Sequence, residues 1–146
     1  MVCCMLVTTT SFKNSAPVPF KAPGIFFEYN SSDFIYHSES WLHPDSVCAS
    51  ISKLALSNPW TFRVYVHCDS GEKNIKKLCE KRWQRIRKLL IAKGMPESSL
   101  SVDKKLDTEP IITADEIKSK PEKERQELRK KNCRASFKIV STDKKE

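Results

Sequence analysis

The stretch from Thr61 to Gly94 constrains the fold of this chain more than any other, because a strand in it is followed directly by a long helix. Between residues 61 and 68, apolar and polar residues alternate with the period of a half-buried strand. Between residues 72 and 93, apolar residues recur at helical spacing, at Ile75, Leu78, Cys79, Ile86, Leu89 and Leu90. We therefore predict a strand and an amphipathic helix in immediate succession.

One position on this helix does not fit an apolar core. Arg82 lies four residues after Leu78 and four before Ile86, so it falls on the apolar stripe. A guanidinium at such a position must reach solvent along its own stem or meet a negative partner. Asp69, at the end of the strand, is the nearest acid outside the predicted helix. Together, Asp69 and Arg82 predict either a structural ion pair or the frame of a small polar binding site.

The rest of the chain completes an α+β pattern, and its 146 residues suit one domain with a proper core. Pro44 begins a first helix that Asn58 and Pro59 end, and Gly94 is placed to cap the long helix. Further strands are predicted over residues 25–29, 100–102 and 134–140, and a solvated helix over 121–131. This order predicts a two-layer α+β sandwich, βαβαββ, with two main helices on one face of a four-stranded mixed sheet.

The two ends differ in composition from the part between them. Residues 1–22 carry Thr, Ser and Pro without periodicity, and we predict an N-terminal tail or the remnant of a signal sequence. Residues 142–146 are predicted to form a disordered tail, which leaves 23–141 as the domain. Since no run approaches the roughly 18 apolar residues of a membrane span, we do not expect the chain to cross a membrane.

No motif in the sequence indicates catalysis. There is no catalytic set of serine, histidine and aspartate, and the three glycines form no phosphate-binding loop. His67 and Cys68 point to opposite faces of their strand, so they cannot hold one metal ion together. The six cysteines form no C-x-x-C pair and are expected as buried free thiols, although a disulfide between Cys68 and Cys79 stays open. We therefore expect a non-catalytic protein without a cofactor or metal.

The positive charge of the chain suggests an anionic partner as one interpretation. The net charge is +8, and residues 72–93 carry nine Lys or Arg against two Glu. With Tyr65 and Trp83 nearby, this helix could follow a phosphate backbone, so a basic nucleic-acid-binding protein is an alternative function. A solvated outer face of the helix explains the same charges without any partner.

Several short motifs occur in a fixed order along the chain. The strand ends in VHCD at Val66–Asp69, and the helix continues with Leu78, Cys79 and Arg82 in the pattern L-C-x-x-R. The set is completed by FFEYNSS at residues 26–32, Ile86, Leu90, Gly94, EPI at 109–111 and NCRASFKIV at 132–140. This ordered set resembles the C-terminal OmpA-like peptidoglycan-binding domain, which also occurs in flagellar-motor stator proteins and peptidoglycan-associated lipoproteins. The resemblance covers roughly residues 24–141.

The resemblance implies a function and a site. The domain would clamp the diaminopimelate of the peptidoglycan stem peptide and anchor an envelope component to the cell wall, with outer-membrane or other envelope proteins as further partners. Asp69 would bind the ammonium of the ligand, and Arg82 its carboxylate, which fits the fork of a guanidinium. Asn74 and Arg134 would be further ligand-binding residues. The implied location is the periplasm, at the cell wall or outer membrane, and nucleic acid is not expected as a partner.

The sequence departs from the family pattern around this site. Val66 and Cys68 stand where the family has glycine and threonine, and the turn after Asp69 is about two residues shorter. Asn74 lies one position from the asparagine of the family, and Trp83 replaces a small alanine. An OmpA-like scaffold that has lost its ligand and serves as a protein-interaction module is therefore a further alternative.

Overall fold

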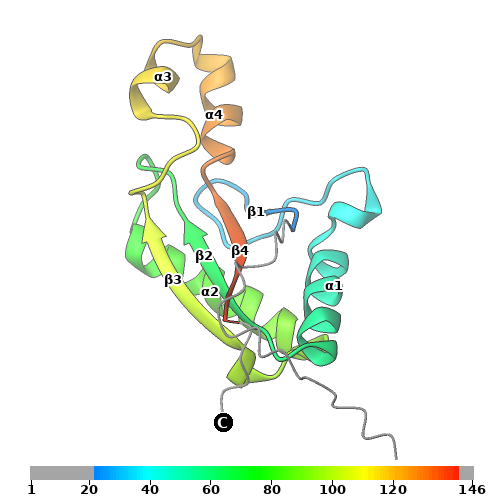
Figure 1. Cartoon of the computed structure of the whole chain (residues 1–146). Helices are drawn as coiled ribbons and strands as arrows, with labels where there is room; N and C mark the ends of the chain where they lie inside the picture. Colours follow the sequence, from blue (N-terminus) through cyan, green and yellow to red (C-terminus); the bar gives the residue numbers. More distant parts are fainter. Residues whose placement is uncertain (1–21, 142–146) are drawn as a thin grey trace, which may run out of the picture.

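A computed structural model describes residues 22–141, and the predictions for residues 1–21 and 142–146 lie outside this range. It contains a four-stranded sheet in the order β1-β4-β2-β3 (Figure 1). The elements are β1 (Ile25–Phe26), η1 (Ser40–Leu42), α1 (Pro44–Ser57), β2 (Thr61–His67), α2 (Ile75–Ala92), η2 (Glu97–Ser99), β3 (Leu100–Leu106), α3 (Ala114–Lys118), α4 (Glu122–Lys130) and β4 (Arg134–Ser141). The predicted α+β sandwich is confirmed. Along the chain, α3 and α4 lie between β3 and β4.

The sheet is mixed, with β2 parallel to β3 and antiparallel to β4. The first strand is shorter than the predicted residues 25–29, because Phe27 forms only an isolated bridge, with Phe34, beyond Ile25 and Phe26. The third strand is longer than predicted, since its pairing with β2 continues through the charged residues to Leu106. Charged side chains suit β3, which forms one edge of the sheet.

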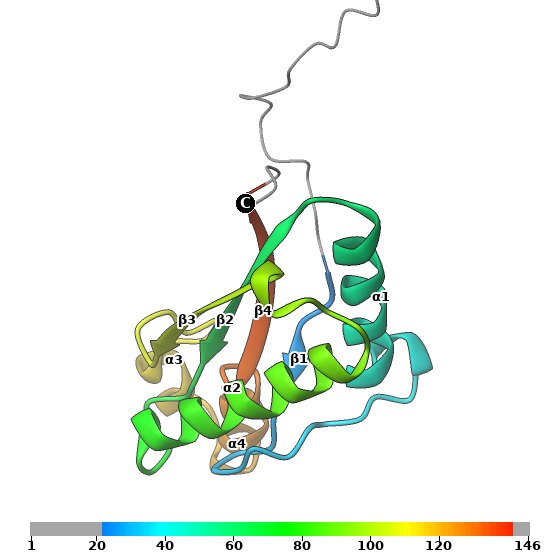
Figure 2. The ribbon, with the colours of Figure 1, turned by 90° about the horizontal axis from the view of Figure 1, so that it is seen from below.

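The core lies between the sheet and α2, which crosses one face of the sheet with α1 beside it (Figure 2). The face of β4 that carries Ala135, Phe137 and Ile139 is buried. The helix α2 buries the face that its periodicity predicts, with Leu78, Cys79, Arg82, Trp83, Ile86 and Leu90. Arg82 therefore does lie within the core, and its charge must be neutralised there.

Both ends of α2 depend on residues with left-handed backbone conformations. Asn74, directly before the helix, has φ 51° and ψ 52°, and its side chain forms no capping hydrogen bond with the described residues. At the other end Gly94 has φ 98°. The N–H groups of Gly94 and Met95 donate to the carbonyl groups of Ile91 and Leu90, each at 3.0 Å. This pair of hydrogen bonds is a Schellman motif, so the predicted glycine cap is confirmed.

The charged segment between β3 and β4 folds into α3 and α4, which project beyond one end of the sheet (Figure 1). The predicted solvated helix is confirmed as α4, which has no buried residue. The shorter α3 is held by Ile117, whose side chain is buried. No helix between residues 22 and 141 combines the length and the apolar character needed to cross a bilayer.

Candidate functional site

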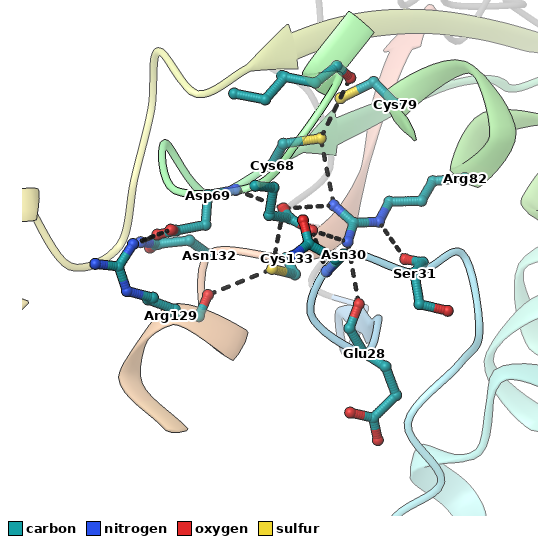
Figure 3. Close-up of polar contacts among 12 residues, drawn as sticks. Glu28, Asn30, Ser31, Cys68, Asp69, Cys79, Arg82, Arg129, Asn132 and Cys133 are labelled. Atoms are coloured by element: carbon teal, nitrogen blue, oxygen red, sulfur yellow. Dashed lines mark hydrogen bonds and ion pairs between the residues drawn. The ribbon is translucent and has the colours of Figure 1, made fainter. Parts of the chain in front are cut away.

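Arg82 is fully buried, and every N–H donor of its guanidinium has an acceptor within the protein (Figure 3). Its Nε donates to the carbonyl of Ser31 at 3.0 Å, and Nη1 donates to Glu72 Oε1 at 2.9 Å and to the Cys68 sulfur at 3.3 Å. Its Nη2 donates to the carbonyl of Glu28 at 3.2 Å and to Glu72 Oε2. A guanidinium has five donors, so none is left for another group in this state.

The negative partner of Arg82 is Glu72, whose side chain is likewise fully buried. The same carboxylate accepts from the backbone N–H groups of Asp69 and Asn30, at 2.8 and 2.9 Å. The thiol of Cys133 donates to it at 3.2 Å. The first of the two interpretations from the sequence, a structural ion pair between Asp69 and Arg82, is therefore wrong. The turn after β2 folds back, with Glu72 N–H donating to the Asp69 carbonyl at 3.0 Å, and this places the Glu72 side chain under α2.

Asp69 is 1% exposed and has its own cationic partner. Its Oδ1 accepts from the backbone N–H of Gly71 at 2.9 Å and from Nη1 of Arg129, on α4, at 3.1 Å. Its Oδ2 accepts from the side-chain amide of Asn132 at 2.9 Å. Asp69 and Arg82 thus belong to one network, joined through Glu72, but each is paired with an opposite charge from the chain itself (Figure 3).

Gly71 allows Arg129 to cross the turn after β2. A Cβ at this position would lie 1.9 Å from Nη1 of Arg129 and 2.8 Å from the hydroxyl of Tyr29. Both contacts are shorter than ordinary van der Waals contacts, so any larger residue forces the two side chains to move. The approach of Arg129 to Asp69 therefore depends on a glycine at this position.

The buried pair of Glu72 and Arg82 stays ionised. Burial alone would raise the pKa of Glu72, but the hydrogen bonds and positive charge of Arg82 outweigh it and hold that pKa below its ordinary value. Burial would lower the pKa of Arg82, and Glu72 instead raises it. Burial, followed by the charge of Glu72, raises the pKa of Cys133 to about 12, so its sulfur is a neutral thiol that can donate.

Comparison with solved structures shows which fold this is. The peptidoglycan-associated lipoprotein of Burkholderia pseudomallei is similar with a TM-score of 0.62 and 13% identity, over 80% of this chain and 89% of that one. The C-terminal domain of Helicobacter pylori MotB is similar with a TM-score of 0.60 and 24% identity, over 82% and 84%. The OmpA-like domain of FopA1 from Francisella tularensis has a TM-score of 0.55 and 13% identity, over 84% and 74%. This chain has the OmpA-like fold.

No protein-family model and no curated protein matches this chain in sequence. The resemblance stated from the short motifs is thus confirmed in its fold. The motif residues are few and widely spaced, and their order along the chain indicated the fold although overall identity is low.

The other two expected site residues of the OmpA-like domain lie in different places. Asn74 lies at the start of α2 and lines two adjacent open grooves there, of about 390 and 590 Å³, together with lysines that include Lys73 and Lys77. Arg134 lies on the opposite face of the sheet, since its neighbour Ala135 points into the core. It donates to the carbonyl of Glu109 at 3.2 Å. The structure therefore brings Asp69, Arg82 and Asn74 to one region and leaves Arg134 outside it.

Glu72, Arg129 and Asn132 are the site residues that the sequence-based assignment missed. The helical periodicity that extends over residues 72–93 groups Glu72 with the charges of the helix, whereas α2 begins only at Ile75. Arg129 and Asn132 lie some sixty residues beyond Asp69, so no local pattern connects them to it. One signal was available, because Glu72 is closer in sequence to Arg82 than Asp69 is.

The cysteines within residues 22–141 are free, as predicted from their positions. Cys48, Cys68, Cys79 and Cys133 are all buried. In this part of the chain no three His, Cys, Asp or Glu side chains are grouped to hold a metal ion.

Proposed function

We propose that this OmpA-like domain binds peptidoglycan non-covalently through the diaminopimelate of the stem peptide, and so anchors an envelope component to the cell wall. The periplasm, at the cell wall or outer membrane, is the location that fits this role. The proposal rests on the fold that the domain shares with a peptidoglycan-associated lipoprotein. The observation that carries it is the presence of a buried carboxylate and a buried guanidinium, Asp69 and Arg82, in one network.

The chemistry of the ligand fits these two groups. One end of diaminopimelate carries an ammonium and a carboxylate on the same carbon. Asp69 suits the ammonium, and Arg82 suits the carboxylate because a guanidinium binds a carboxylate with two parallel hydrogen bonds. In the structure Arg129 and Glu72 supply the same two charges. Binding therefore takes place by exchange, with the ligand replacing the internal partners.

The grooves at the start of α2 offer an approach to this site. Lys73, Lys77 and Lys81 line the smaller groove, and they are exposed without an ion-pair partner among residues 22–141. Their positive charge attracts the carboxylates of a stem peptide. Asn74 lines both grooves, and its side-chain amide forms no capping hydrogen bond among residues 22–141, which supports its place in the proposed site. Arg134, on the other face of the sheet, would act only on a separate part of the polymer.

Sedimentation with purified sacculi tests the proposal. We expect the wild-type chain to sediment, and Asp69→Ala and Arg82→Ala to lose about 2–5 kcal/mol of binding, because each leaves a ligand charge unpaired. Lys88→Ala is the matched control, since it removes an exposed charge from the same helix outside the network. Circular dichroism must show that each variant is folded. If both folded site variants sediment like the wild type, the clamp does not exist.

A specific observation favours one alternative, a scaffold that no longer binds the ligand. All donors of Arg82 and three acceptor positions of Asp69 are filled by the chain itself. If this closed state is permanent, the folded wild-type chain stays in the supernatant with sacculi at every concentration. A protein-interaction module would then be the function that remains.

A further inference from the structure

We propose that Glu72 is an internal ligand that closes the carboxylate-binding site of Arg82, and that the turn of residues 69–74 must release it before a ligand enters. This inference rests on the proposed function for the identity of the ligand. It concerns how the site is opened and which ligands it accepts.

Glu72 and Arg82 form two parallel hydrogen bonds, one from each terminal nitrogen of the guanidinium to one carboxylate oxygen. Both side chains are fully buried. A free ligand carboxylate would form the same two bonds with Arg82, so the two carboxylates compete for one position.

Glu72 lies in a turn rather than in a helix or strand. Besides Arg82 and Cys133, this carboxylate is held by the backbone N–H groups of Asp69 and Asn30. Asn30 also accepts from the backbone N–H of Lys73 at 2.8 Å, so the loop that contains Asn30 fastens the turn from outside. Release of this loop removes one hydrogen bond to Glu72 Oε2 and the hydrogen bond that holds Lys73 at the same time.

An open groove lies beside this turn. Glu72 itself lines the groove of about 590 Å³, together with Lys76 and Lys77. Both lysines are exposed and form no ion pair with the described residues. A Glu72 side chain that leaves Arg82 therefore enters an open space where two ammonium groups replace its lost partner. This lowers the cost of the exchange, because the displaced charge does not stay unpaired.

Asp69 is paired with an internal cation, Arg129, that is easier to displace than Glu72. The side chain of Arg129 is 29% exposed, and its helix α4 has no buried residue in the described structure. One ammonium and one carboxylate from the same ligand can thus replace Arg129 and Glu72 together. A ligand with only a carboxylate leaves the second exchange incomplete. The site therefore favours the end of an amino acid with both charges over a simple carboxylic acid.

The test removes the internal ligand and measures whether an added ligand takes its place. In full-length Glu72→Ala, we expect meso-diaminopimelate to raise the midpoint of thermal unfolding by several degrees, and acetate at equal ionic strength to raise it less. The wild type should shift much less with either probe. The dissociation constant of diaminopimelate should be at least tenfold lower for Glu72→Ala than for the wild type. The matched control is Glu72→Ala combined with Arg82→Met, which should respond to neither compound.

Glu72→Gln covers the case in which Glu72→Ala does not fold, because glutamine keeps the size of the side chain and an acceptor oxygen. It should also bind diaminopimelate more tightly than the wild type. Equal affinity in the wild type and in the folded Glu72 variants overturns the inference, as does an equal response of the double variant. These outcomes are separate from the sacculus experiment. A wild type that sediments while Glu72 variants gain nothing supports the proposed function alone, and variants that gain affinity while no form sediments support the internal ligand alone.

Discussion

Arg82 shows how a charged residue can occupy a core position. Its five donors meet three backbone or thiol acceptors and one bidentate carboxylate, and its guanidinium lies 5.1 Å from the ring centre of Phe27. A buried ion pair adds little net stability, but the loss of one partner is costly. Removing one partner of a buried ion pair destabilises the fold strongly, because it leaves an uncompensated charge. Replacing both partners by neutral residues costs much less.

We therefore expect Arg82→Met to lower the free energy of unfolding by about 3–5 kcal/mol, because Glu72 is left as an unpaired buried charge. Combining it with Glu72→Gln should recover at least about 1 kcal/mol, since glutamine is neutral and its carbonyl oxygen can still accept from one of the two N–H groups, that of Asp69 or that of Asn30. Urea unfolding of the two single variants and the double variant measures this. Strictly additive losses would contradict the importance of the pair.

His67 provides a second prediction for a single residue. It is 3% exposed, and its Nδ1 has no hydrogen-bond partner among the described residues. Burial, followed by the charge of Arg134, lowers the pKa of His67 to about 4, below the ordinary value of 6.5. Because the folded-state pKa is the lower one, the stabilisation is complete above pH 6.5 and is lost as the pH falls towards 4.

We expect the free energy of unfolding to fall by about 1–3 kcal/mol between pH 7 and pH 4, with a further loss below about pH 4.5 as Glu72 is protonated. His67→Gln should remove the loss that His67 causes between pH 6.5 and 4, and leave the loss that Glu72 causes below about pH 4.5. Denaturant titrations at several pH values compare the two proteins. An unchanged pH profile in the variant would show that His67 is not the titrating group.

At the scale of elements, the turn between β2 and α2 connects the network. We expect Gly71→Ala to lower the free energy of unfolding by about 1 kcal/mol, because its Cβ would meet Arg129 and Tyr29 and separate Arg129 from Asp69. Gly24→Ala is the matched control, since a Cβ there lies 3.4 Å from its nearest atom and needs little movement. Thermal unfolding of both variants measures the difference, and equal midpoints would mean that Arg129 adapts at no cost.

At the scale of the whole molecule, the network joins segments that are distant in sequence. The loop at residues 28–31, the turn at 69–74, α2 and Cys133, directly before β4, all contribute to it. The α3–α4 excursion is attached mainly through Asn132, which accepts from the N–H groups of Ile111 and Ile112, and through Arg129. Stability is therefore expected to be uneven, with a firm body and a looser excursion.

Hydrogen exchange measures this difference directly. We expect the slowest amide exchange in β2, β4 and the middle of α2, and much faster exchange in α3 and α4, where Ile117 is the buried anchor. Asn132→Ala should speed exchange in residues 107–118 much more than in β2. Uniform protection across the domain would show that the excursion unfolds only with the core.

The two helices α1 and α2, the strand β2 and the burial of Arg82 follow from local patterns. Helical and strand periods depend on residues a few positions apart. An arginine on the apolar stripe of a helix therefore indicates a buried charge that requires a partner. The length of β1 and the presence of α3 were not predictable in this way. They depend on the bridge of Phe27 to Phe34 and on the buried position of Ile117.

The order of the main helices and strands, the OmpA-like fold and the presence of Arg82 in the core follow from sequence patterns. Which residues neutralise that charge depends on contacts between distant segments. Glu72 reaches Arg82 because the turn before α2 folds back, and Asp69 is paired instead with Arg129 from a helix sixty residues away. Hydrogen-bond partners are chosen by packing between distant segments, and periodicity contains no information about such contacts.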